Sequence, residues 1–241
     1  MLDEIVAKNK LTANAVLAIY PANSIKEDVN VYEDETRGKA LATLHFLRNQ
    51  QEKEKGVPNL SLADFIAPQA YQDYIGMFAV TAGVGLEKWV DYYEKQNDDY
   101  SAMLFKFLAD RLAEAFAELL HYKVRSDFWG YASNEKMHVE RMLKEDYQGI
   151  RPAPGYPACP DHSEKQSLFQ LMDVEKNCGI TLTENFAMYP AASVCGYYFA
   201  HPEAQYFNLA RISKDQVVNY AERKQIPLKL VEKQLASTIN Y

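Results

Sequence analysis

One segment of the sequence concentrates the residue types that could hold a small charged ligand. Residues 151–160 read RPAPGYPACP, with four prolines and one glycine among ten positions. Each proline fixes its own φ and removes a backbone donor, and the residue before it is driven to extended geometry. The segment, which we name the proline ledge, therefore predicts a stiff, extended loop whose preset path and exposed carbonyls suit a ligand.

Three residues of the proline ledge could supply specific contacts. Arg151 carries a planar guanidinium that can pair with a carboxylate through two parallel hydrogen bonds. Gly155 permits a positive φ or a close approach to the backbone, and Tyr156 adds an aromatic wall with a hydroxyl at its edge. The same residues would also suit a rigid connector between two helices, with Arg151 in a salt bridge. Physical chemistry alone leaves both interpretations open.

Other kinds of chemical site have little support. The five histidines show no spacing typical of a metal site, and no CxxC pair occurs. His162 follows an aspartate and precedes a predicted helix, which favours a capping or surface position over catalysis. No catalytic dyad or triad is recognisable. The glycine-rich turn of a Rossmann-type methyltransferase, which would indicate an independent enzyme, is also missing.

The composition is that of an acidic, soluble chain. Its 241 residues include 33 acidic and 26 basic side chains, which gives a net charge of -7. This balance does not provide the basic surface that nucleic-acid binding requires. No signal-peptide pattern is recognisable, and no apolar run approaches the ~20 residues of a membrane span. We expect a cytoplasmic protein with neither a nucleic-acid nor a membrane partner.

Short strands are expected before the proline ledge. Residues 15–20 and 29–32 have β-type patterns and are separated by a predicted turn at 21–23, and a third strand is expected at 42–47. Residues 74–81 are nearly all apolar, which predicts a strand covered on both faces.

Long helices are expected next. Residues 86–128 have a helical pattern that breaks at 97–99, where Asp98 or Asp99 could cap the second helix. This second helix is expected to pack against the sheet through one apolar stripe. The stripe consists of Leu104, Leu108, Leu112, Ala115 and Leu119. A short helix is expected at 134–144.

Beyond the proline ledge we expect a helix, three strands and two helices, at 163–173, 181–188, 193–200, 206–212, 215–224 and 228–235. The strand at 206–212 should pair with the one before it across a turn at 201–203, as a hairpin. Strands and helices thus cluster separately. The predicted fold class is α+β, a single domain with a twisted, mostly antiparallel sheet packed against long helices.

A resemblance supplies a family for this pattern. Residues 147–162, YQGIRPAPGYPACPDH, resemble the signature of the activation domain of cobalamin-dependent methionine synthase, in which Arg-x-x-x-Gly-Tyr is the S-adenosylmethionine-binding motif. Other blocks resemble the family in the same order along the chain: 20–23, 34–37, 62–65, 73–76, 108–118, 129–131 and 182–184. Because these blocks span the chain, the sequence is identified as a member of that family.

The resemblance implies roles for the proline ledge. Arg151 would bind the methionine carboxylate of S-adenosylmethionine. The backbone around Ala153 and Gly155 would contact the adenosine and amino-acid portions. Tyr156 would lie close to the cobalt face of the corrin when the partner domain docks.

The resemblance also implies three candidate residues outside the ledge. Tyr206, with Phe207 beside it, matches a residue that contacts the ligand, and Glu114 matches an acidic residue near the ligand. Each has an alternative that the residues themselves leave open. Tyr206 could be a cross-strand core residue, and Glu114 could form an ordinary helix ion pair with Arg111.

By the resemblance, the chain is a reactivation module of methionine synthase, the 5-methyltetrahydrofolate–homocysteine methyltransferase, and is inactive alone. A methyl group from S-adenosylmethionine and an electron from flavodoxin or a flavoprotein reductase would restore oxidised cobalamin to methylcobalamin. The cobalamin would be carried by a neighbouring cobalamin-binding domain. Because the sulfonium is already a good leaving group, the module would supply binding and orientation and no catalytic residue.

The resemblance raises one further expectation, about extent. The family's domain begins upstream of this sequence with a segment that supplies an acidic ligand for the amino group of S-adenosylmethionine. Residues 1–241 are therefore expected to be an activation domain that lacks the N-terminal part. This leaves an alternative function open, a docking module for the cobalamin domain and flavodoxin that has lost S-adenosylmethionine binding.

Overall fold

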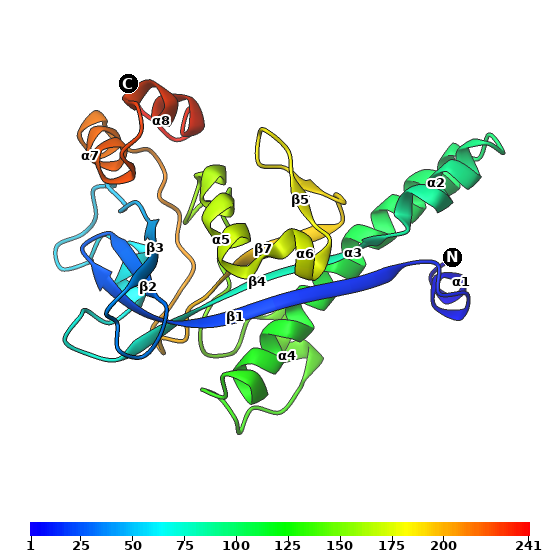
Figure 1. Ribbon diagram of the computed structural model, residues 1–241, viewed down its shortest axis with the longest axis horizontal. Coiled ribbons are helices and arrows are strands. Elements are labelled where there is room, and N and C mark those ends of the chain that lie inside the picture. The colour runs from blue at the N-terminus through cyan, green and yellow to red at the C-terminus, as the bar shows by residue number, and fades with distance from the viewer. The chain divides into compact units, whose positions relative to one another are not determined.

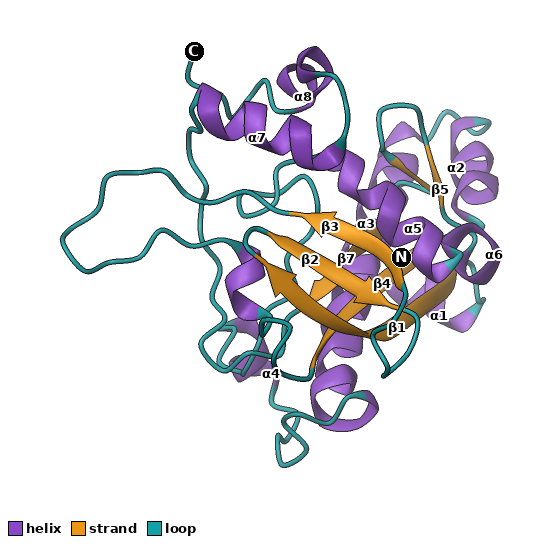
Figure 2. Ribbon diagram, turned by 60° about the vertical axis from the view of Figure 1, so that its left-hand side comes forward, coloured by secondary structure: helices purple, strands orange, loops and turns teal.

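A five-stranded sheet organises the chain, with the strand order β3-β2-β1-β4-β7, and a separate two-stranded sheet joins β5 to β6. The computed structural model describes residues 1–241 and confirms the predicted α+β class (Figure 2). The chain divides into two compact units, and each is assembled from three stretches of sequence. The first unit comprises Met1–Leu17, Phe78–Asp146 and Met172–Cys195, and the second comprises Ala18–Met77, Tyr147–Leu171 and Gly196–Tyr241.

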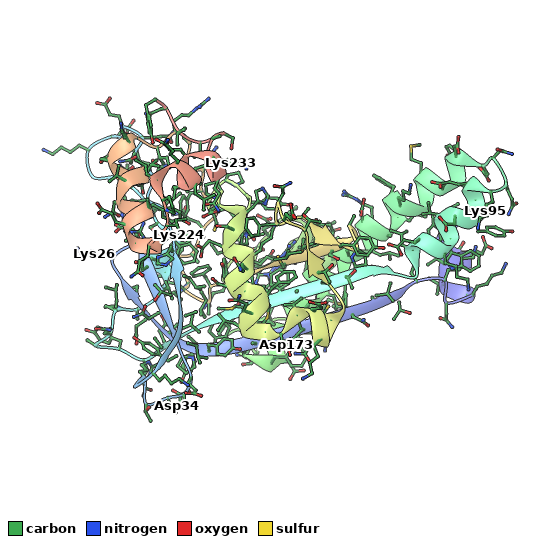
Figure 3. The ribbon with its side chains drawn as sticks, turned by 45° about the horizontal axis from the view of Figure 1, so that its top comes forward. Lys26, Asp34, Lys95, Asp173, Lys224 and Lys233 are labelled. Carbon is green, nitrogen blue, oxygen red and sulfur yellow. The ribbon has the colours of Figure 1, made fainter.

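The first two strands form a tight hairpin. β1 (Thr12–Ile25) pairs antiparallel with β2 (Asp28–Tyr32), so that only residues 26 and 27 connect them. Lys26, which is labelled in Figure 3, has a φ of 57°. A positive φ is what a two-residue hairpin loop requires, because its twist must match that of the strands.

The turn predicted at 21–23 is therefore wrong, because β1 runs unbroken through Pro21. Asn23 does not turn the chain. Its fully buried side-chain amide instead donates to three carbonyls of the neighbouring loop, those of Ala67, Pro68 and Tyr71. These long-range bonds replace the local bonds that an asparagine makes in a turn.

The other three strands of the five-stranded sheet lie close to their predicted positions. β3 (Ala40–His45) pairs antiparallel with β2, and β7 (Ser193–Tyr198) forms the opposite edge of the sheet. β4 (Asp73–Val84) extends the predicted strand at both ends. Its residues 75–83 are all buried, which confirms that this strand is covered on both faces.

In the first unit, three helices follow one another along the sequence: α1 (Leu2–Ala7), α2 (Leu86–Glu94) and α3 (Asp99–Lys123). Figure 1 shows α2 and α3 side by side as a helical hairpin. The side chain of Asp98 accepts a hydrogen bond of 3.0 Å from the Ser101 N–H, which caps α3. The predicted break and its cap are both confirmed.

The buried face of α3 is not the predicted leucine stripe. Of the five residues predicted, three are half-buried and two are exposed. The buried face lies on a different set of positions: Ala102, Phe105, Ala109, Ala113, Ala117 and Leu120. The apolar steps of three and four are present, but the buried face lies one residue away from the predicted stripe, which is about 100° around a helix. Small alanines allow close packing there, and Phe105 joins Ile5, Leu86 and Val90 in the core of this unit.

The connection after α3 is held by a buried ion pair. A π-helical turn at Val124–Phe128 ends α3, and α4 (Val139–Leu143) is shorter than the helix predicted at 134–144. The fully buried Arg125 binds Glu135 through two hydrogen bonds of 2.7 and 2.8 Å. The Glu135 N–H also closes a turn by donating to the Ala132 carbonyl at 2.9 Å, and α4 begins four residues later.

The strand predicted at 181–188 is instead a small hairpin. After α6 (Val174–Cys178), β5 (Thr181–Leu182) and β6 (Met188–Tyr189) pair antiparallel. The turn is closed by the Ala187 N–H, which donates to the Thr183 hydroxyl at 3.1 Å. A threonine side chain that bonds to backbone in this way competes with a continuous strand.

The second unit contains the helices predicted after the proline ledge: α5 (Lys165–Met172), α7 (Lys214–Lys224) and α8 (Leu228–Gln234). Pro227 separates α7 from α8, as expected. α7 packs beside β3 (Figure 1). One buried cluster unites α7 and α8 with the segment before α7 and with the residue that follows β3 by two positions: Leu47, Leu209, Ile212, Val217, Tyr220, Ala221, Val231 and Leu235. None of the helices has the length and apolar character needed to cross a membrane.

Candidate functional site

The proline ledge is anchored along the β7 edge of the sheet. Ile150 exchanges backbone hydrogen bonds with Phe199, at 3.1 and 3.0 Å, and the Pro152 carbonyl accepts 2.9 Å from the Tyr197 N–H. As predicted, residues 151–160 are neither helix nor regular strand. These hydrogen bonds to the sheet therefore fix the backbone path of the first residues of the ledge.

The second half of the ledge departs from the extended path that we predicted. The Tyr156 N–H donates to the Ala153 carbonyl at 3.2 Å, and the Cys159 N–H donates to the Tyr156 carbonyl at 2.9 Å. A third bond of 2.7 Å runs from the Gly155 N–H to the Cys159 carbonyl. Two consecutive tight turns therefore fold this part back on itself, since prolines that fix φ near -65° also suit turns.

Gly155 is required at its position for two reasons. Its φ is 99°, a conformation that side chains rarely adopt. The imidazole of His162 lies against it, so that a Cβ built on Gly155 would be 2.2 Å from Cε1 of that ring. His162 itself receives a hydrogen bond of 2.9 Å at Nδ1 from the Lys165 ammonium. The imidazole thus forms the floor of the Gly155–Tyr156 turn.

Arg151 and Tyr206, which lie 55 residues apart in sequence, meet at the start of the ledge. The Arg151 backbone N–H donates to the Tyr206 phenol oxygen at 3.0 Å. Arg151 is half-buried, whereas Tyr206 keeps 43% of its surface exposed. Tyr206 is therefore not a cross-strand core residue. It is an exposed aromatic ring fixed to the ledge by its hydroxyl.

The hairpin predicted between the strands 193–200 and 206–212 is wrong. The chain after β7 forms no strand there, and only Ile212 makes an isolated bridge, to Ile239. The Leu209 N–H instead donates to the Pro157 carbonyl of the ledge at 3.0 Å, and Asn208 bonds to the Ala210 N–H at 2.7 Å. The segment thus bonds to the ledge instead of forming a strand, and β7 pairs only with β4 in the sheet.

The two ends of this segment have different environments. The side chain of Phe207 packs against the buried cluster of α7 and α8. Beyond it, a hollow of about 420 Å³ borders the ledge. The hollow is lined by Gly155, Tyr156, Pro157, Pro160, Asn208, Ala210, Arg211, Ser237 and Thr238. Tyr156 is 60% exposed at its rim, so this aromatic ring is available to a partner molecule.

A buried charge cluster supports the end of the ledge. The Lys224 ammonium, on α7, donates to Asp161 at 2.7 Å, to Glu164 at 2.6 Å and to the Ser163 hydroxyl at 2.9 Å. Tyr220, one turn earlier on α7, donates to Asp161 at 2.9 Å. Both carboxylate side chains are only 2% exposed. Lys224 is labelled in Figure 3.

The cluster perturbs the ionisation of its members. Burial alone would raise the pKa of Asp161, but the Lys224 charge and hydrogen bonds from Ser163 hold that pKa below its ordinary value. Burial likewise opposes the charge of Lys224, yet Glu164 and Asp161 raise the pKa of its ammonium. Asp161 and Lys224 are therefore both ionised near neutral pH. We did not predict this cluster, although an Asp-His-Ser sequence before a helix is a capping signal.

The remaining candidate, Glu114, belongs to the first unit. It lies on α3 and is half-buried. The ion pair with Arg111 that was considered as its alternative role does not form, because the Arg111 guanidinium lies over the Phe107 ring, 5.2 Å from its centroid. The carboxylate of Glu114 is therefore not engaged by its helix neighbour.

Comparisons with known proteins agree with the resemblance found in the sequence. Residues 1–225 match the protein family described as "Vitamin B12 dependent methionine synthase, activation domain". A solved structure, the crystal structure of the MetH reactivation domain bound to AdoHcy, is 49% identical, with a TM-score of 0.97. The match covers 100% of the present chain and 74% of that one.

Proposed function

The chain belongs to the activation-domain family of vitamin B12-dependent methionine synthase, and we propose that its proline ledge binds S-adenosylmethionine for the reductive methylation of cobalamin. The observation that carries this proposal is the junction of Arg151 with Tyr206. It joins the backbone of Arg151 to the exposed aromatic ring of Tyr206 within the second unit, which supports a ligand site there.

Arg151 is suited to the carboxylate of the methionine moiety. A guanidinium offers two parallel N–H donors, and a charge-assisted pair of this kind is about twice as strong as a neutral hydrogen bond. Arg151 is half-buried, so water screens its charge less than at an exposed site. Because its backbone is held by Tyr206 and its neighbour Pro152 by β7, the side chain starts from a fixed point.

The ledge backbone can recognise the rest of the ligand. The N–H of Ala153 and the carbonyl of Gly155 form no hydrogen bond within the chain, and both residues are half-buried. A partly buried donor and acceptor that lack partners favour a ligand that supplies them. Adenosine and an α-amino acid both carry donors and acceptors. We infer that these two groups contact them, while the Tyr206 ring borders the ligand.

Tyr156 and Phe207 have different parts in this proposal. The exposed ring of Tyr156 faces the partner that carries cobalamin. Phe207 keeps Tyr206 in place, because its own side chain is packed in the core beside α7 and α8. Glu114 retains the ligand-contacting role that the resemblance implies, as a separate prediction.

Methyl transfer requires the protein to bind and orient the ligand, and it requires no proton-transferring side chain. Cobalamin, bound to its own domain, supplies the nucleophile, and the sulfonium of S-adenosylmethionine is a good leaving group without protonation. The contribution of Arg151 and the ledge backbone is to hold the methyl group in one orientation and to reduce the entropy lost on reaction. We further propose flavodoxin or a flavoprotein reductase as the electron donor and the cytoplasm as the location. A docking module without a ligand site is not favoured, because the related domain was crystallised with AdoHcy.

Calorimetric titration of the whole chain with S-adenosylmethionine tests the proposal. Loss of the Arg151 pair should cost about 1.5–3 kcal/mol, so the Arg151→Ala variant should bind roughly ten- to a hundredfold more weakly. Arg141→Ala is the matched control, because it removes an arginine whose ion pair with Asp146 is exposed. Binding that is equal in all three proteins contradicts the role of Arg151, and no binding to the wild-type chain contradicts the proposal itself. Glu114→Gln in the same series tests the separate prediction.

A further inference from the structure

We infer that His162 and Lys224 are positioning residues that hold the Gly155–Tyr156 turn in its ligand-binding shape, an inference that rests on the proposed function. Neither side chain is among the residues that the resemblance assigns to the ligand. Both act through the ledge, His162 by direct contact and Lys224 through the turn that carries His162.

The contact between His162 and the ledge is close. Three atoms of its ring lie within 2.2 to 2.8 Å of the point where a Cβ of Gly155 would be. The ring therefore covers the face that glycine leaves open, directly beneath the peptide that leads to Tyr156. Such a contact restrains the turn from one side, while the bond from Gly155 to the Cys159 carbonyl restrains it from the other.

The imidazole is itself held in place. The Lys165 ammonium donates to its Nδ1 at 2.9 Å, so that nitrogen is unprotonated. Burial, and then the charge of Lys165, lower the pKa of His162, while Asp161 opposes the shift. The ring is thus neutral at physiological pH and has one fixed tautomer, with its proton on Nε2.

Lys224 fixes the backbone from which the His162 ring projects. The residues on either side of His162 are Asp161 and Ser163, and the Lys224 ammonium bonds to both. Asp161 also accepts the Ser163 N–H at 2.8 Å, which closes the short helical turn at His162–Glu164. One ammonium on α7 therefore sets the position of a turn more than 60 residues earlier in the sequence.

The cluster could instead serve only the stability of the fold. Two features argue for positioning. The ring of His162 reaches the ledge although the residue as a whole is exposed, so it is not part of the buried core. The ledge also has few bonds of its own beyond its turns, and a displacement of about 1 Å in a positioning group is enough to impair a site strongly.

Ligand affinity in matched variants tests the inference. We expect His162→Ala to weaken S-adenosylmethionine binding about tenfold while lowering stability only modestly, because the variant loses one hydrogen bond, that from Lys165, and no core side chain. His162→Phe restores a ring under Gly155 and should bind within about threefold of the wild type. A role in stability alone predicts equal affinity for all three folded proteins, and that result would overturn the inference.

Lys224 requires a further control, since Lys224→Met removes the ammonium that pairs with two buried carboxylates and destabilises the chain. Lys233→Met removes an exposed lysine of α8 that forms no ion pair, and both lysines are labelled in Figure 3. Measured well below the melting temperature of the weaker variant, Lys224→Met should bind at least about tenfold more weakly and Lys233→Met should match the wild type. Equal binding by Lys224→Met overturns the inference for this residue.

Hydrogen exchange tests the same inference without a ligand. The amides of Gly155 and Cys159 should exchange about tenfold faster in His162→Ala and Lys224→Met, while buried amides of β4 serve as the internal standard. Unchanged exchange at the ledge contradicts the inference. If the wild-type chain does not bind S-adenosylmethionine but ledge exchange responds as expected, the proposed function fails and the positioning of the turn stands.

Discussion

Substitution of Gly155 by alanine tests the geometry of the proline ledge most sharply. Two separate penalties are expected there. The φ of 99° is unfavourable for any residue with a Cβ, and the new methyl group would lie 2.2 Å from the His162 ring. Gly56 provides the matched control. It has a similar φ of 95°, but nothing lies within 4 Å of its added Cβ.

The two penalties have different sizes. The backbone cost is about 1–2 kcal/mol at a positive φ, and it applies to Gly56→Ala and Gly155→Ala alike. Because the His162 ring is at the end of a side chain, it can rotate away from the methyl group. It then loses its hydrogen bond from Lys165, which costs about 0.5–1.5 kcal/mol. We therefore expect Gly155→Ala to cost about 1.5–3.5 kcal/mol in unfolding free energy, about 1 kcal/mol more than Gly56→Ala.

Urea denaturation of four proteins separates these terms. In a double-mutant cycle of Gly155→Ala with His162→Ala, the two sites should be coupled by about 0.5–1.5 kcal/mol, because the methyl group has no ring to displace in the double variant. Titration with S-adenosylmethionine should show weaker binding by Gly155→Ala and unchanged binding by Gly56→Ala. A coupling of zero, with equal costs for the two glycines, would falsify the contact between Gly155 and His162.

Three other predictions concern different parts of the chain. Tyr206→Phe removes the acceptor of the Arg151 N–H, so it should lower the free energy of unfolding by about 0.5–1.5 kcal/mol in urea denaturation and should weaken ligand binding. Unchanged stability and affinity would contradict the hydrogen bond between Arg151 and Tyr206. Glu135→Gln removes the carboxylate charge that binds the fully buried Arg125 and should cost about 1.5–3 kcal/mol, the value of a hydrogen bond to a charged group, whereas a loss below about 0.5 kcal/mol, on the order of a surface change, contradicts this. The folded pKa of Asp161 lies below its ordinary value of 3.8, so its stabilising effect is complete above that pH and is lost as the pH falls further. Asp161→Asn should therefore flatten the acid limb of the stability profile, and an unaltered limb contradicts the assignment.

Features set by local sequence could be predicted. The four prolines of the ledge exclude regular structure through their own φ angles, and Asp98 caps α3 through a bond to a neighbour three residues away. Pro227 likewise separates α7 from α8. The role of Arg151 was a different kind of prediction, because it depended on resemblance and not on the spacing of residues.

Features set by long-range contacts could not be predicted. Tyr206 reaches Arg151 through a bond between residues 55 positions apart, and the expected hairpin fails because Leu209 bonds to the ledge carbonyl of Pro157. Which face of α3 is buried depends on the elements that pack against it. The spacing of apolar residues alone cannot distinguish between two neighbouring apolar stripes. The bonds of Lys224 span about 60 residues, and no local pattern marks that lysine among the others.

Transfer of a labelled methyl group tests the central claim most directly. The chain would be mixed with methyl-labelled S-adenosylmethionine, a chemical reductant and the cobalamin-loaded partner domain, and the label on cobalamin would be followed. We predict transfer with the wild-type chain and with Arg141→Ala, and at limiting ligand roughly ten- to a hundredfold less transfer with Arg151→Ala. Equal transfer in the presence of Arg151→Ala, or in the absence of the chain, would contradict the claim that the proline ledge presents the methyl group.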